Sequence, residues 1–130
     1  MHCVNMYKVR LLMKSVSKEL VAASSKMMIL SILSAEESYG YSILQTVKVT
    51  TEGGWKWTDG MIYPVLHRLE KEKLIKSHWV ESETGRKRKY YQITDKGIKF
   101  LQREMEEWQF VDATLHKLWG VKTCNLSSLY

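Results

Sequence analysis

A run of four basic residues follows a glycine in the middle of the chain. The run, 86–89, reads Arg-Lys-Arg-Lys after Gly85, between two segments that alternate apolar and polar residues as β-strands do. Gly85 can adopt the positive φ that a tight hairpin turn requires. Cations on a short rigid turn are suited to contacts with phosphate groups. A solvated basic turn is also common, so the run alone leaves both interpretations open.

A second group of candidate residues lies on a helix predicted from Thr58 to Lys73. Thr58 is a suitable N-cap for this helix. The apolar positions of the helix recur at helical spacing. That spacing leaves Tyr63 and His67 one turn apart on the outward face, where both can reach base edges or phosphates. The helix and the basic hairpin therefore predict one nucleic-acid-binding surface.

Charge supports a polyanionic partner. The chain of 130 residues carries a net charge of +6, and residues 55–100 hold 11 Lys and Arg against 6 Asp and Glu. Such an excess suits nucleic acid or an anionic membrane surface. We find no apolar run of transmembrane length and no secretory signal, and therefore expect a cytoplasmic protein with no membrane partner.

The elements that position these residues are three helices, a hairpin and a final helix. The predicted order is helix Ser17–Ser34, helix Tyr39–Val49, a short strand Trp55–Trp57, helix Thr58–Lys73, strands Leu74–Glu83 and Arg88–Thr94, and a last helix ending near Trp119. This order is typical of a winged helix-turn-helix, whose third helix enters the major groove. The fold class is mainly α with a small β-hairpin wing (α+β).

The predicted organisation has four parts. Residues 1–16 form a flexible extension, 17–93 the winged helix, 94–119 a C-terminal dimerisation helix and 120–130 a frayed tail. The composition, 45% hydrophobic and 26% charged, suits one globular domain.

Catalytic and metal-binding patterns are missing from the sequence. The four histidines are scattered, and no zinc-protease, serine-hydrolase or phosphate-loop motif occurs. We expect neither an enzyme nor a cofactor or metal site. Cys3 and Cys124 lie near opposite ends, and a redox or metal sensor that brings them together stays an alternative.

Three motifs resemble one family. Tyr-Gly-Tyr at 39–41, Tyr-Pro-Val-Leu-His-Arg-Leu-Glu at 63–70 and Gly-Arg-Lys-Arg-Lys-Tyr-Tyr-Gln-Ile-Thr at 85–94 together look like the PadR family of transcriptional regulators, over about residues 17–119. The resemblance implies a dimer that binds double-stranded operator DNA as a repressor. With the helix start and the hairpin tip, the expected DNA-binding residues are Tyr39, Thr58, Tyr63, His67, Arg86, Lys87 and Lys89.

The last helix carries an apolar seam. Residues at alternating spacings of three and four form a heptad pattern, and the expected dimer-interface residues are Ile98, Leu101, Met105, Trp108, Leu115 and Trp119. Asp112 occupies one position of this seam where an apolar residue is usual. A polar seam residue can also serve only to fix the register of a dimer.

The short C-terminal region is similar to a multidrug-sensing branch of the family, in which ligands bind at the dimer interface. Trp108 and Asp112 combine an aromatic wall with a carboxylate, which suits a planar aromatic or cationic ligand. The expected ligand-binding residues are Leu20, Ala23, Met27, Met105, Trp108 and Asp112. The alternatives are a plain dimer core and, more broadly, a winged-helix protein-interaction or architectural module without an effector.

Overall fold

The structure is a computed structural model that describes the backbone of residues 16–123 and the side chains of residues 16–120. It divides into two compact units along the last helix, between Gln102 and Arg103. The predicted domain boundary at residue 94 therefore differs from the observed division. The first turns of the last helix belong to the winged-helix unit. Residues 1–15 of the predicted N-terminal extension and residues 124–130 of the predicted tail lie outside the described residues.

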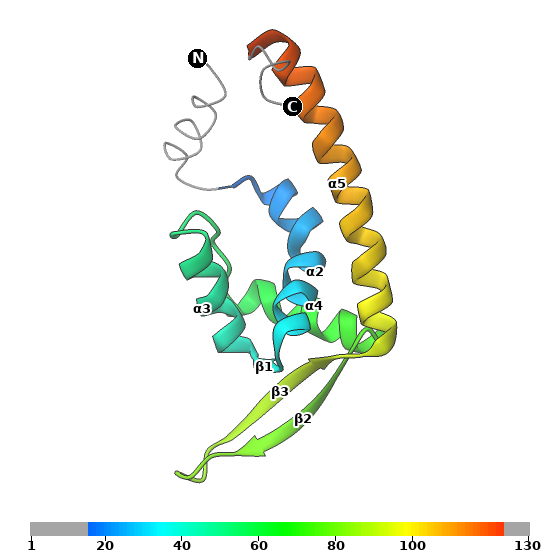
Figure 1. Cartoon of the computed structure of the whole chain (residues 1–130). Coiled ribbons are helices and arrows are strands. Elements are labelled where there is room, and N and C mark those ends of the chain that lie inside the picture. The colour runs from blue at the N-terminus through cyan, green and yellow to red at the C-terminus, as the bar shows by residue number, and fades with distance from the viewer. Residues whose placement is uncertain (1–15, 124–130) are drawn as a thin grey trace. The chain divides into compact units, whose positions relative to one another are not determined.

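Three helices form most of the winged-helix unit, which ends at Gln102 (Figure 1). They are α2 (Lys18–Ala35), α3 (Gly40–Thr50) and α4 (Asp59–Lys71). Ser17 caps α2 as predicted, because its Oγ accepts a hydrogen bond from the Leu20 N–H at 3.3 Å. Thr58 is the N-cap of α4, and that helix continues through Pro64.

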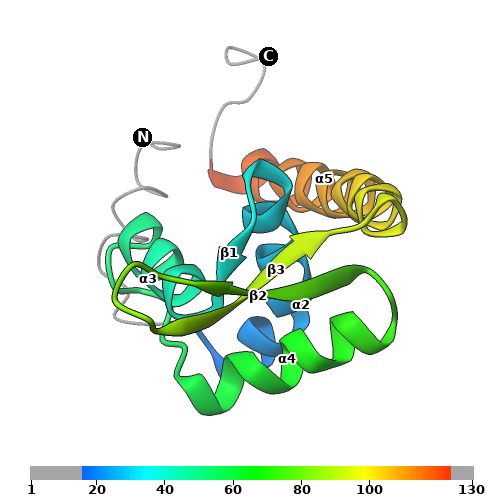
Figure 2. The same ribbon diagram turned by 90° about the horizontal axis from the view of Figure 1, so that it is seen from below.

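A three-stranded antiparallel sheet completes this unit. Its strands are β1 (Ser38–Tyr39), β2 (Ile75–Glu81) and β3 (Lys87–Ile93), in the order β1-β3-β2. Figure 2 shows the β2–β3 hairpin beside α4, with β1 on the other side of β3. β1 was not predicted from the sequence, and the second helix was predicted to begin at Tyr39. A strand of two residues has no alternation to detect, and it exists because Ser38 and Tyr39 pair with Tyr91 and Tyr90.

The predicted strand at Trp55–Trp57 was wrong. This segment is irregular, and Trp55 is buried at 6% exposure in a small cluster with Val21 and Val47. The rings of Trp55 and Trp57 meet edge to face with centroids 6.0 Å apart. The two tryptophans therefore alternate because they pack on α2 and α3, not because they form a strand.

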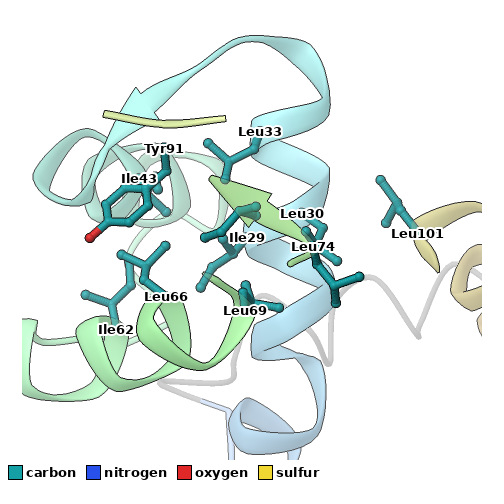
Figure 3. Packing of buried hydrophobic residues seen from close by; sticks show 11 residues of the cluster. Ile29, Leu30, Leu33, Ile43, Ile62, Leu66, Leu69, Leu74, Tyr91 and Leu101 are labelled. Atoms are coloured by element: carbon teal, nitrogen blue, oxygen red, sulfur yellow. The ribbon is translucent and has the colours of Figure 1, made fainter. Parts of the chain in front are cut away.

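The main core lies between the helices and the inner face of the sheet (Figure 3). It is built from buried aliphatic side chains and one tyrosine: Ile29, Leu30, Leu33, Ile43, Ile62, Leu66, Leu69, Leu74, Ile75, Tyr91 and Leu101. Burial of this kind is the main favourable term in folding. The predicted stripe of α4 (Ile62, Leu66 and Leu69) is fully buried in it.

The last helix, α5 (Asp95–Thr123), is a single helix of 29 residues. It continues through Gly120, so the predicted end at Trp119 was wrong. One glycine in a helix interior costs only about 1 kcal/mol, which neighbouring turns can offset. Leu101 is 5% exposed and belongs to the core of the winged-helix unit. It is therefore not available to a dimer interface, which corrects its predicted role.

The end of α4 and the start of α5 are tied together. Lys73 adopts a left-handed φ of 65° after α4, and the Leu74 N–H donates back to the Leu69 carbonyl at 3.0 Å, which completes a Schellman motif. Thr94 then caps α5: its Oγ1 donates to the Lys73 carbonyl at 2.7 Å and accepts from the Gly97 N–H at 3.0 Å. The helix start is thereby fixed to the turn that follows α4.

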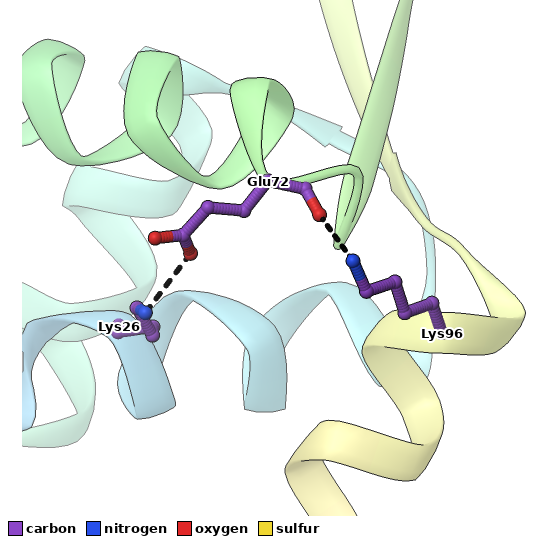
Figure 4. A network of polar contacts seen from close by, with 3 residues as sticks. All are labelled: Lys26, Glu72 and Lys96. Atoms are coloured by element: carbon purple, nitrogen blue, oxygen red, sulfur yellow. Dashed lines mark hydrogen bonds and ion pairs between the residues drawn. The ribbon is translucent and has the colours of Figure 1, made fainter.

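A polar network adds to this joint (Figure 4). The Lys26 ammonium of α2 pairs with the Glu72 carboxylate at 3.0 Å, and the Lys96 ammonium of α5 donates to the Glu72 carbonyl at 3.0 Å. These partners are partly exposed, and exposed ion pairs stabilise by less than about 1 kcal/mol. The network therefore orients three elements around one residue more than it stabilises the fold.

Candidate nucleic-acid interface

The outer face of α4 is exposed and basic. Pro64, His67, Arg68 and Lys71 are all exposed, while the opposite side of the helix is buried in the core. His67 therefore lies where the sequence analysis expected it. A helix that is anchored by one apolar stripe and presents cations outward can approach a DNA groove without disturbing its own packing.

Tyr63 is less free than its position in sequence indicates. It is 44% exposed, and its ring lies against the first residue of α3. A Cβ added to Gly40 would lie 2.5 Å from the Tyr63 Oη, so only glycine permits this approach. Tyr63 thus joins α3 to α4 and exposes part of its ring beside His67.

Thr58 lies exposed at the start of α4. Its carbonyl accepts hydrogen bonds from the N–H groups of Met61 and Ile62, both at 3.0 Å, but its side chain does not cap the helix. Its hydroxyl therefore does not satisfy the first-turn N–H groups of α4, near which an anion such as a phosphate is stabilised.

The hairpin turn spans Ser82 to Arg86. The Gly85 N–H donates to the Ser82 carbonyl at 2.9 Å, and Gly85 has the expected positive φ, 83°. Arg86 and Lys87 are exposed at this tip. These two cations match the predicted phosphate-contacting residues of the wing.

The four consecutive cations do not form one patch. From residue 87 onward they belong to β3, where neighbouring side chains point to opposite faces. Lys87 and Lys89 share the face of Tyr91, while Arg88 shares the face of Tyr90. A run that looks continuous in sequence therefore supplies cations to both sides of the wing.

Lys89 is held by α4. Its ammonium lies 3.6 Å from Glu70 Oε1, and it lies 5.6 Å from the centroid of the Tyr91 ring. The Ser77 hydroxyl of β2 also donates to the Glu70 carboxylate. Glu70, which the sequence analysis missed, therefore binds both strands of the wing to α4, and Lys89 is a weaker phosphate contact than predicted.

Tyr91 lies between the wing and α4. Burial raises the pKa of its hydroxyl above the usual 10.0, and the nearby Glu70 and Tyr63 raise it further. The hydroxyl is therefore neutral at physiological pH. It adds no charge to the face that carries Lys87.

Tyr39 lies on the other face of the sheet. Its ring is tilted against Tyr90 with centroids 5.2 Å apart, and the Arg88 guanidinium lies 4.5 Å from the centroid of the Tyr39 ring. The structure does not bring Tyr39 together with Lys87 and Lys89, which lie on the face of Tyr91. Its half-buried ring supports the pairing of β1 with β3.

The described part of α5 from Arg103 onward displays a broad apolar sector. Of the predicted seam, Met105 is 42% and Trp119 45% exposed, and Trp108 and Leu115 are half-buried. Ile98, in the winged-helix unit, is 40% exposed. Beyond the predicted seam, the same side of the helix presents two further exposed apolar residues, Val111 and Leu118.

The predicted ligand-binding residues fall into two groups. On α2, Leu20 and Ala23 are exposed, and Met27 packs in part against the main core. On α5, Asp112 is exposed, and its carboxylate lies 3.2 Å from His116 Nε2 one turn later. Asp112 is thus paired within its own helix rather than buried alone. Cys3 and Cys124 lie outside the described residues, which leaves the sensor alternative untested.

No cluster of potential metal ligands occurs among the residues that the structure describes. Among those same residues, no helix combines the length and the apolarity that a membrane span requires.

Comparison with known proteins identifies the family. Residues 29–103 match the transcriptional regulator PadR-like family, which covers the winged helix and the joint to α5. The chain belongs to the PadR-like family. It is a DNA-binding transcriptional regulator rather than an enzyme.

Solved PadR-like structures share this fold. A PadR-like transcriptional regulator from Bacillus cereus is 36% identical with a TM-score of 0.71, over 78% of this chain and 97% of that one. A transcriptional regulator from Clostridium thermocellum is 31% identical with a TM-score of 0.70, over 77% and 97% of the two chains.

Two curated relatives are also similar. An uncharacterized protein X from Lysinibacillus sphaericus is 30% identical over 72% of this chain and 85% of its own. Transcriptional regulator YqjI from Escherichia coli is 30% identical over 67% of this chain but only 40% of its own length. The similarity to YqjI therefore concerns a part of that larger protein.

Proposed function

We propose that this PadR-like regulator is a homodimeric repressor that binds operator DNA and is released by a planar aromatic or cationic ligand. The observation that carries the DNA-binding mode is the clamp of Glu70 on Ser77 and Lys89. It links the wing to α4, so we expect His67 on the helix and Lys87 on the wing to contact the same duplex. α4 supplies base contacts in the major groove, and the wing supplies phosphate contacts.

Dimerisation is supported by the apolar sector of α5. Contiguous exposed apolar surface of this kind marks an interaction site in soluble proteins. A second copy of the same helix is the simplest partner, because a twofold dimer uses one self-complementary patch. Two joined winged helices would read two half-sites of an operator. Repression then needs only occupancy of promoter DNA, in the cytoplasm.

Sequence-specific binding is the direct test. A duplex that the protein selects from a random pool is compared with an unselected duplex at moderate salt. We expect a preference of at least about 1,000-fold, since specific sites exceed non-specific DNA by that margin. Equal affinity for both duplexes would instead support the architectural module, whose backbone contacts do not distinguish sequences.

The wing lysines predict different salt effects. Replacing Lys87 with Ala removes an exposed cation, so the slope of log affinity against log salt should fall by about one. Replacing Lys89 with Ala should change the slope less, because this ammonium is already paired with Glu70. Lys117→Ala removes the same charge from the part of α5 beyond the winged-helix unit and is the matched control. Equal slopes for Lys87→Ala and wild type would contradict the wing assignment.

The ligand proposal rests on Trp108 and Asp112 of α5. The indole offers a flat wall, and the Asp112 carboxylate, paired with His116 in the free chain, can exchange this partner for a ligand cation. Met105 adds an adaptable side chain. The contribution of Leu20, Ala23 and Met27 from α2 stays a prediction.

A dye-binding measurement tests this site. Planar cationic dyes should bind the wild-type dimer and lower its affinity for operator DNA, since the two ligands are coupled. Trp108→Ala should abolish dye binding while the dimer persists, and Trp108→Phe should weaken it less. Unchanged dye binding in Trp108→Ala would contradict the site. Loss of the dimer in this variant would assign Trp108 to the dimer core instead.

A further inference from the structure

An exposed tryptophan lies on the wing and has no part in the core. Trp79, at the fifth position of β2, is 66% exposed. A tryptophan is the largest apolar side chain, and its burial would stabilise the fold. Trp79 lies on a strand that the core holds only at the other end, through Ile75, so its ring is available for a contact outside this unit.

The strand register places Trp79 among the α4-facing cations. Trp79 lies directly opposite Lys89, and Glu81 lies opposite Lys87. Directly opposed residues share a face of the sheet, so Trp79 lies on the face that includes Ser77 and Tyr91. Trp79, Glu81 and Lys87 together line a shallow depression.

This face is continuous with the DNA-binding surface of α4. Ser77 and Lys89, which flank Trp79 along and across the sheet, both contact Glu70 of α4. The opposite face of the wing instead carries Arg88 on Tyr39 and His78 stacked on Tyr90, with ring centroids 6.2 Å apart. The aromatic side chains of that opposite face therefore already contact another ring or a cation. Trp79, on the face of Tyr91, takes no part in these contacts.

We propose that Trp79 is a DNA-contacting residue of the wing, whose indole packs on the sugar–phosphate backbone of the duplex beside the Lys87 phosphate contact. This inference rests on the proposed binding mode and adds a residue to it. The apolar ring covers deoxyribose, and the indole N–H can donate to a phosphate oxygen. A charged duplex is favoured as the occupant because Lys87 and Lys89 lie on the same face of the hairpin as the ring.

The expected signature is a loss of affinity without a loss of salt dependence. The indole is uncharged, so Trp79→Ala releases no fewer counterions than wild type. We expect it to weaken binding about tenfold, as loss of a packed aromatic contact does, and to do so equally for selected and unselected duplexes. Trp79→Phe should retain most of the affinity, because the ring survives.

Val80 provides the matched control. It is the next residue of β2 and is 36% exposed. It pairs with Arg88 and therefore lies on the other face of the sheet from Trp79. Val80→Ala should leave affinity unchanged. An unchanged affinity in Trp79→Ala, or an equal loss in Val80→Ala, would overturn the proposal. A fall in salt slope for Trp79→Ala would also overturn it, since it would mean that the wing cations had moved.

Hydroxyl-radical footprinting of the wild-type protein gives a second measurement that needs no variant. The tryptic peptide 77–86 contains Trp79 as its single tryptophan. We expect duplex DNA to protect this indole from oxidation several-fold, on selected DNA and on unselected DNA at low salt. No protection on bound DNA would overturn the proposal. Protection that depends on protein concentration without DNA would overturn it too, by assigning Trp79 to a protein contact.

The two proposals fail differently. Equal binding of selected and unselected duplexes would reject the sequence-specific repressor, yet Trp79 protection could still be read on either duplex. Conversely, a strong preference for the selected duplex together with an unprotected Trp79 would support the repressor proposal and reject the Trp79 contact.

Discussion

Replacing Gly97 with Ala should destabilise the winged-helix unit by about 3 kcal/mol, near the upper end for overpacked positions. A Cβ on Gly97 would lie 2.1 Å from the Leu74 carbonyl oxygen and 2.7 Å from Ile93 Cγ1. The carbonyl is backbone and already accepts a hydrogen bond from the Thr94 N–H at 3.0 Å. Neither the strand end nor the helix start can therefore move without breaking the cap of α5.

Thermal unfolding measures this effect. For a domain of this size, the expected loss lowers Tm by on the order of 15 °C. Gly60→Ala is the matched control, because its Cβ would meet no atom closer than Thr58 Oγ1 at 3.8 Å. Alanine favours an exposed helix position by about 1 kcal/mol, so this control should be as stable as wild type or more so. A Gly97→Ala variant as stable as wild type would show that α5 is not seated tightly on the Leu74 turn.

The same joint bears on regulation. Glu72 connects α2, the end of α4 and the first turn of α5 through Lys26 and Lys96. Because α4 ends and α5 starts within this network, a change in the angle of α5 would, in the proposed function, act directly on α4. A ligand bound between dimerisation helices would need no further element to alter DNA affinity.

The sequence predicted the elements that carry strong periodicity. The helices α2 and α4 were found because apolar spacing is local, and the predicted side-chain cap is present at Ser17 but not at Thr58, which only occupies the N-cap position. The family and its winged-helix fold are confirmed. What local patterns could not supply was β1, which exists only through pairing with β3.

The wing shows why a charge run is weaker evidence than a strand register. In sequence, four cations look equivalent. In the structure, Arg88 covers Tyr39 and Lys89 binds Glu70, so Arg86 and Lys87 remain exposed. Alternation along β3 would have predicted the split between faces. The partner of Lys89 could not be predicted, because Glu70 is 19 positions away on another element.

The seam of α5 was predicted only in part. The heptad spacing correctly marked an apolar side of the helix, but it placed Leu101 in the interface although the winged-helix core buries it. Periodicity shows which side of a helix is apolar and not what covers it. Val111 and Leu118 were missed because they lie on the edge of the strict heptad pattern while still on the same broad sector.

Charging that sector should abolish the proposed dimer and, with it, tight operator binding. Val111 and Leu118 are 50% and 61% exposed, so replacing both with Glu leaves the folded chain intact. In a twofold dimer each substitution occurs twice on one patch, so apolar contacts are lost and like charges face each other. Sedimentation should show a monomer at concentrations where wild type is dimeric.

Affinity for the selected duplex should then fall by about 100-fold or more, because two linked heads gain a large effective concentration that single heads lose. Phe110→Glu is the control, since this ring is 74% exposed on the other side of α5. It adds a charge to the same helix and should leave both dimer and affinity unchanged. If the Val111→Glu, Leu118→Glu chain remained dimeric with full affinity, the apolar sector would not be the dimer interface. If the Phe110 variant dissociated instead, the opposite side of α5 would hold the partner.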